Sequence, residues 1–120
     1  MASILRVNTL TDAGSNNSTA MSVVNQGVAK AWFFANGDAS LQDSTNMASA
    51  TDNSTGNYGY TFTNNMNNDD TSQTTTANTG IDRGSNTSGR ATTGLTVEVF
   101  NQAGSNDDSN FSATIHGDLA

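Results

Sequence analysis

Three short clusters of acidic and amide residues are the first candidates for chemistry in this sequence. They read TDNSTGN at 51–57, NNDD at 67–70 and SNDDSN at 105–110. Each could supply oxygen ligands to a Ca²⁺ ion, which takes about six to eight of them. None has the spacing of an EF-hand loop with its final glutamate, and Asx residues in turns commonly hydrogen-bond their own backbone. We therefore interpret the clusters as turns, and we expect no metal or other cofactor.

Groups that could act in catalysis are equally sparse. The single histidine, His116, lies on an expected final strand without a partner motif, and we interpret it as an exposed residue at a strand end. Glu98 alternates with Val97 and Val99, so it belongs to a solvent or interface face. The sequence contains neither a nucleophile elbow nor a glycine-rich loop with phosphate-binding spacing. These patterns predict a protein that is not an enzyme.

The charge of the chain excludes further classes. The 120 residues carry a formal net charge of −7 with four Lys and Arg, and no Cys. A nucleic-acid-binding protein needs a basic footprint that this sequence lacks. No apolar run has the length of a signal peptide or a membrane span, so we expect synthesis in a cytoplasm and no insertion into a membrane.

The composition indicates which elements must position any functional residues. Hydrophobic residues make up 33% of the chain, charged residues 12%, and proline is absent. Threonine favours strands, whereas asparagine, serine and glycine favour turns. We therefore predict an all-β protein, a small antiparallel β-sandwich or barrel-like domain with long polar loops.

The N-terminal part is expected to form a separate segment. Residues 3–10 alternate as a strand, with Leu5 and Val7 on one face. Residues 21–27 fit a short strand or one helical turn, and the pattern does not decide between them. We predict that residues 1–28 form an N-terminal strand and turn for assembly or attachment, and that residues 29–120 form a β-rich appendage domain.

Two hairpins are expected in the first half of the β-rich part. In the first, Asn36-Gly37 predicts a type I′ turn between an aromatic strand and a weaker strand near Leu41. The second joins a strand near Met47 to an aromatic strand through a turn at 52–57. That aromatic strand places Tyr58, Tyr60 and Phe62 on one face, which is typical of a core strand.

The second half of the chain has a weaker pattern. Residues 64–94 contain few apolar groups, so we expect long surface loops there, with the threonine run as an edge strand. Residues 95–100 and 111–116 alternate clearly and are expected to pair with each other. In the first of these strands, Phe100 points away from the apolar face.

The stretch AKAWFF at 29–34 contains the largest apolar cluster. In a strand, Trp32 and Phe34 share one face and Phe33 lies on the other, so both faces are apolar. We predict that Lys30, Trp32, Phe33 and Phe34 form a subunit interface of a homotrimer, because exposed apolar patches are rare on monomers. The alternative is that both faces are buried within one sandwich, and an exposed receptor patch is the least favoured interpretation.

Several of these residues resemble a pattern found in structural proteins of tailed bacteriophages, particularly marine and cyanobacterial phages. The similarity spans nearly the whole chain and is specific between positions 29 and 66. Val28 stands where the pattern has arginine, and Asn67 stands where it has proline. The matching residues are Ala29-Lys30-Ala31-Trp32, Asn36-Gly37, Ser49, Thr51-Asp52-Asn53, Thr55-Gly56, Tyr58, Phe62-Thr63 and Met66.

The resemblance implies a β-rich virion structural protein, often trimeric. We therefore expect a short tail-fibre-like or receptor-binding appendage whose polar loops contact host cell-surface glycans. One alternative is a capsid decoration protein on the phage head, and another is a carbohydrate-binding module. The expected partners are further copies of the chain and other virion proteins, and the expected location is the virion.

Overall fold

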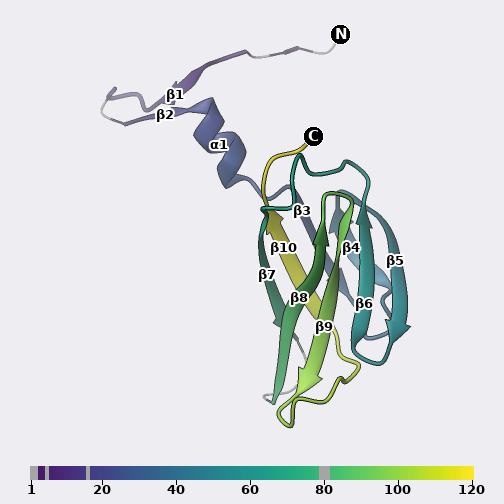
Figure 1. Ribbon diagram of the computed structural model, residues 1–120. Coiled ribbons are helices and arrows are strands. Elements are labelled where there is room, and N and C mark those ends of the chain that lie inside the picture. Colours follow the sequence, from purple (N-terminus) through teal and green to yellow (C-terminus); the bar gives the residue numbers. More distant parts are fainter. Residues whose placement is uncertain (1–2, 5, 16, 79–81) are drawn as a thin grey trace.

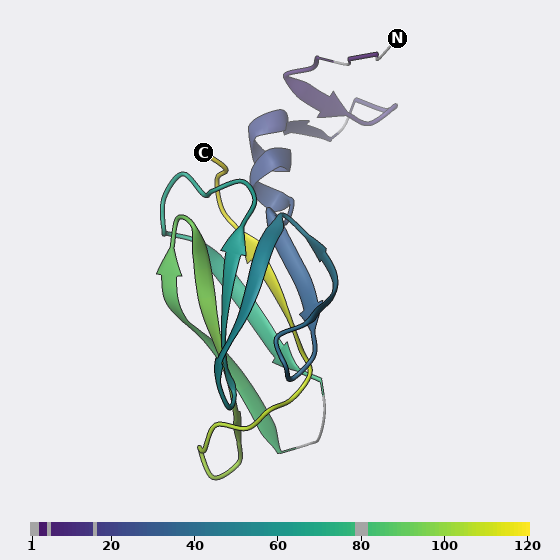
Figure 2. The same ribbon diagram turned by 90° about the vertical axis from the view of Figure 1, so that its right-hand side faces the viewer.

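The computed structural model describes residues 3–4, 6–15, 17–78 and 82–120. It consists of an N-terminal arm, which we define as the described residues before Ala29, and a β-sandwich (Figure 1). The molecule is elongated, with extents of 53 × 29 × 28 Å. Figures 1 and 2 show that the arm projects from one end of the sandwich and that the C-terminus lies at the same end. We call this the arm end, and the opposite end the distal end.

The sandwich consists of two four-stranded antiparallel sheets that pack face to face, which confirms the predicted fold class. One sheet has the order β4-β3-β10-β7 and the other has the order β5-β6-β9-β8. The eight strands are β3 (Ala31–Ala35), β4 (Leu41–Thr45), β5 (Met47–Ser54), β6 (Asn57–Phe62), β7 (Ser72–Ala77), β8 (Arg83–Ala91), β9 (Gly94–Asn101) and β10 (Phe111–His116).

Alternating side chains from both sheets form one core. Every second residue of β6, β9 and β10 is buried, as expected for strands with one face on a core. Aromatic rings dominate the centre: Phe33 stacks on Tyr60 at 4.2 Å between centroids, and Tyr58 stacks on Phe111 at 5.1 Å. The four rings therefore join the two sheets.

The arm contributes nothing to this core. It comprises β1 (Thr9–Thr11), β2 (Ser18–Ala20) and the helix α1 (Met21–Gly27), which has no buried residue. The expected strand at 3–10 is therefore wrong in extent, and Leu5 lies outside the described residues. The structure also decides the open alternative at residues 21–27 in favour of a helix.

The first predicted hairpin is present, but its turn differs from the prediction. The N–H of Ala39 donates to the carbonyl of Asn36 at 3.0 Å, and the left-handed residue is Ala39 with φ 67°. The type I′ prediction for Asn36-Gly37 is therefore wrong. Glycine is required at 37 because a Cβ there would lie 2.9 Å from the backbone nitrogen of Ser109.

The second hairpin is confirmed, with Tyr58, Tyr60 and Phe62 all buried, but its turn is shorter than the predicted 52–57 because β5 extends to Ser54. The expectation of long loops over 64–94 is wrong, because this range contains β7 and β8. The threonine run does form an edge strand, β7. The predicted pairing of residues 95–100 with 111–116 is also wrong, because β9 and β10 belong to different sheets.

Candidate functional site

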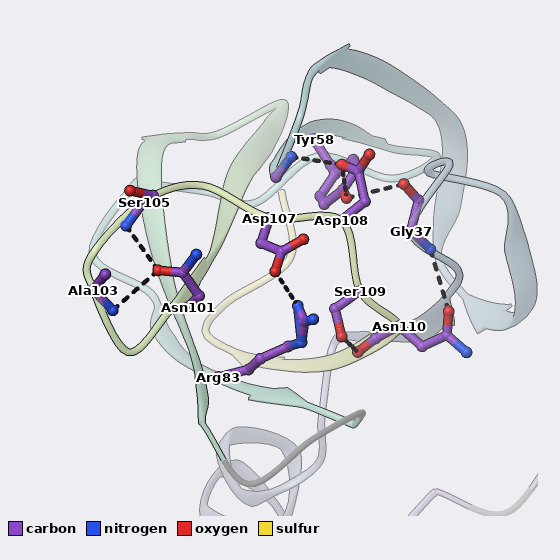
Figure 3. Close-up of polar contacts among 11 residues, drawn as sticks. Gly37, Tyr58, Arg83, Asn101, Ala103, Ser105, Asp107, Asp108, Ser109 and Asn110 are labelled. Atoms are coloured by element: carbon purple, nitrogen blue, oxygen red, sulfur yellow. Dashed lines mark hydrogen bonds and ion pairs between the residues drawn. The ribbon is translucent and has the colours of Figure 1, made fainter.

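The distal end of the sandwich is organised by the loop 102–110, which connects β9 to β10 across the two sheets (Figure 3). Its first turn is fixed by Asn101, whose Oδ1 accepts hydrogen bonds from the N–H groups of Ala103 and Ser105 at 3.0 and 3.1 Å. Gly104 has φ 79°, a left-handed conformation that favours glycine. The side chain of Asn101 therefore defines the shape of the turn.

Asp108 attaches the loop to the second hairpin. Its Oδ1 accepts hydrogen bonds from the N–H of Gly56 at 2.7 Å and the hydroxyl of Tyr58 at 2.9 Å. Burial, together with the hydrogen bond to Asp108, raises the pKa of Tyr58 above its ordinary value. The Tyr58 hydroxyl also lies 3.0 Å from the carbonyl oxygen of Gly37, so Tyr58 links both hairpins to this loop.

Two further contacts complete the attachment. The Oδ1 of Asn110 accepts a hydrogen bond from the N–H of Gly37 at 3.3 Å. On the other sheet, the guanidinium of Arg83 forms an ion pair with Asp107 at 2.5 Å. The loop is thus held at several points along its length, although connecting segments are generally the mobile parts of a domain.

A hollow of about 290 Å³ lies beside this loop. Phe100 forms its apolar part, because it points outward from β9 and is only half-buried. The Phe100 ring lies over Gly84 of β8, where a Cβ would be 2.5 Å from the ring. Around the ring the lining is polar, and the complete set is Asp82, Arg83, Gly84, Phe100, Asn101, Gln102 and Gly104.

The arm end has a different character. Lys30 and Leu119 line two hollows there, of about 460 and 520 Å³, and the Lys30 ammonium donates to the carbonyl of Asn25. Among the described residues, the exposed large apolar side chains other than Trp32 all lie on the arm or at this end: Ile4, Val7, Leu10, Val23, Val28 and Leu119. Exposed apolar surface is thus concentrated at one end of the molecule.

The predicted interface residues separate into two groups. Phe33 is 1% exposed and packs in the core of its own chain, so it cannot contact a partner subunit. The prediction that Phe33 forms part of the subunit interface is therefore wrong. Trp32 is 37% exposed, Phe34 is half-buried, and Lys30 lies at the arm end. The alternative in which both faces of this strand are buried within one sandwich is therefore wrong. Lys30, Trp32 and Phe34 remain predicted subunit contacts.

In the cluster at 105–110, both carboxylates accept contacts from within the same chain. Asp107 and Asp108 bind Arg83 and Tyr58, as described above. In the described part of the chain, no group of three or more histidine, aspartate or glutamate side chains gathers as a metal site would require. His116 is half-buried at the end of β10.

Comparisons with known proteins identify no relative of this chain. No protein-family model matches the chain, and neither a curated protein nor a solved structure does. Within the described residues, no helix has the length and apolar character needed to cross a membrane.

The hollow around Phe100 was not predicted from the sequence. The alternation did predict that Phe100 points outward, but the opposing Gly84 fell in a range expected to be loop. Only the register of β8 on β9, which pairs Gly84 with Phe100, brings Arg83 and Asn101 together beside the ring. A Phe at an outward strand position was the one signal available.

Proposed function

We propose that this chain is a non-enzymatic structural protein of a bacteriophage virion, a short tail-fibre-like or receptor-binding appendage that assembles as a homotrimer. The observation that carries the proposal is the division of the molecule into an apolar arm end and a polar distal end with a firmly held loop. An appendage needs one end for assembly and another for contact. The resemblance at positions 29–66 supports the same class.

The arm is the element that favours assembly. A two-stranded hairpin is marginally stable in water, and an isolated helix shorter than about 12 residues is marginal too. Both elements of the arm are in this position, and their apolar side chains Leu10 and Val23 are exposed. Contacts with other chains would cover these side chains and stabilise the arm.

The distribution of charge favours contact between arms. The arm region contains only Arg6 and Asp12 as charged side chains, so the net charge of −7 belongs entirely to residues 29–120. Like-charged sandwiches repel one another, whereas neutral arms can approach at little electrostatic cost. We therefore propose that the main trimer contact runs along the arms, with Lys30, Trp32 and Phe34 as further contacts.

Light scattering after size-exclusion chromatography tests the assembly. We expect the full chain to have three times the 12.4 kDa mass of one chain, and a chain lacking residues 1–27 to be a folded monomer. A monomeric full chain would contradict the trimer. If the chain lacking residues 1–27 is still a trimer, the subunit interface lies on the sandwich and not on the arm.

Imaging of labelled phage particles tests the virion role. A copy number that is a multiple of the tail symmetry would support the appendage. The same arm geometry also suits a capsid decoration protein, whose copies would instead occupy head lattice points in tens to hundreds. If phage particles lack this chain, both the appendage and the capsid decoration proposals are refuted.

A further inference from the structure

We propose that the hollow around Phe100 at the distal end binds a neutral saccharide. The ring of Phe100 is the stacking platform, and Arg83, Asn101 and Gln102 are the polar contacts. This inference deepens the proposed function and rests on it in one respect only, that the saccharide belongs to a host cell surface.

The position of the Phe100 ring suits stacking. Because Gly84 has no side chain, the ring lies directly over the β8 backbone. Phe100 is also only half-buried, at the side of an open hollow. The face of an aromatic ring carries partial negative charge, which attracts the weakly positive C–H groups on the apolar face of a sugar ring.

The polar residues of the hollow match the hydroxyl groups of a sugar. One nitrogen of Arg83 is bound to Asp107, but a guanidinium carries five N–H donors in a fixed plane. Asn101 is oriented by two backbone N–H groups on its Oδ1, which fixes the direction of its amide N–H₂ (Figure 3). Gln102 is exposed at the same hollow and has both donor and acceptor atoms.

The loop is already ordered before any ligand binds. The contacts of Asp107, Asp108 and Asn110 hold it to both sheets. Ordering a loop and its side chains upon binding lowers affinity, so a loop ordered in advance favours binding.

Charge and size define the class of ligand. The positive charge of Arg83 is balanced by Asp107, Asp82 lines the same hollow, and the chain as a whole is acidic. An anionic sugar would therefore be repelled, and a neutral one is favoured. A volume of about 290 Å³ is at the lower limit of small-molecule sites, which suits one or two sugar rings.

The test uses the purified full chain on a printed array of neutral oligosaccharides, followed by NMR titration with the best binder. We expect chemical shift changes at the side chains of Phe100, Asn101 and Gln102. Phe100→Leu keeps an apolar side chain over Gly84 but removes the aromatic ring, and should lower affinity about tenfold or more, the loss typical of a central contact. Gln42→Ala is the matched control, because it removes an exposed glutamine from β4 of the other sheet, away from the hollow and from the predicted subunit contacts, and it should leave affinity unchanged.

Gln102→Ala keeps the test decisive if Phe100→Leu disturbs folding, because Gln102 is exposed. It should weaken binding severalfold with an unchanged melting temperature. Three results would overturn the proposal: no binding of any neutral saccharide at millimolar concentration, binding that both Phe100→Leu and Gln102→Ala leave intact, or binding that only Gln42→Ala abolishes. If the protein binds a saccharide but is missing from phage particles, the proposed function is refuted and the saccharide site is not. If it is present in the virion but binds no saccharide, the site is refuted and the proposed function is not.

Discussion

Substitution of Asp108 by alanine should destabilise the sandwich far more than the same substitution of its neighbour Asp107. Asp108 accepts two hydrogen bonds, from the buried backbone N–H of Gly56 at 2.7 Å and from the Tyr58 hydroxyl at 2.9 Å. Its removal leaves the Gly56 N–H inside the protein without this acceptor. Asp107 instead forms an ion pair with Arg83, and the two side chains are 36% and 25% exposed.

The two losses differ in magnitude. A hydrogen bond to a charged group contributes about 1.5–3 kcal/mol, and an unsatisfied buried donor costs about 1–3 kcal/mol. Because water can partly replace the exposed carboxylate, we expect Asp108→Ala to lower the free energy of unfolding by about 2–3 kcal/mol. An exposed ion pair contributes about 0–1 kcal/mol, so Asp107→Ala should cost less than ~1 kcal/mol.

Chemical unfolding followed by circular dichroism measures both values, and thermal melting should show a loss of roughly 8–12 °C for Asp108→Ala. The pair is matched, because each variant removes one negative charge from the same loop. If Asp107→Ala destabilised the protein as much as Asp108→Ala, the assignment of Asp108 as the main attachment of the loop would be refuted.

Three further predictions concern the core and its tyrosines. Phe33→Ala should lower the free energy of unfolding by about 3–5 kcal/mol, and Phe34→Ala on the opposite face by less than ~2 kcal/mol; equal losses in urea titrations would contradict the assignment of faces. Gly94→Ala should cost at least ~2 kcal/mol by the same assay, because its Cβ would lie 2.1 Å from the carbonyl oxygen of Tyr60; a neutral effect would refute this close packing. Burial raises the pKa values of Tyr58 and Tyr60, so the stability that they contribute is complete below the unfolded pKa of about 10 and is lost as the pH rises above it. Urea unfolding at increasing pH should show a decline of up to about 1.4 kcal/mol per pH unit for each tyrosine, and Tyr→Phe variants that kept the full decline would argue against this assignment.

The sequence was sufficient where large apolar residues alternate. Tyr58, Tyr60 and Phe62 predicted a core strand, because aromatic residues at every second position lie on one face of a strand, and such a face is normally buried in a folded chain. The separation of Trp32 from Phe33 followed from the same geometry. These predictions needed only local information.

The sequence was insufficient where pairing determines the structure. The β8 sequence RGSNTSGRA has no large apolar residue, and its strand conformation depends on its hydrogen bonds to β9. Gly37 suggested a type of turn, whereas glycine is required at this position because the backbone of Ser109 lies too close for a side chain. The hollow around Phe100 depends on the same long-range register, so no local pattern could define its lining.

The antiparallel pairing of β3 with β10 has a mechanical consequence. The arm enters the sandwich at the first residue of β3, and the distal loop leads into the first residue of β10. Five residue pairs, from Ala31 with Ile115 to Ala35 with Phe111, connect the two strands. A pulling force between the arm and the distal loop would act along the strands, at right angles to the hydrogen bonds between them. All the bonds would then be loaded in shear at once, instead of being unzipped one after another.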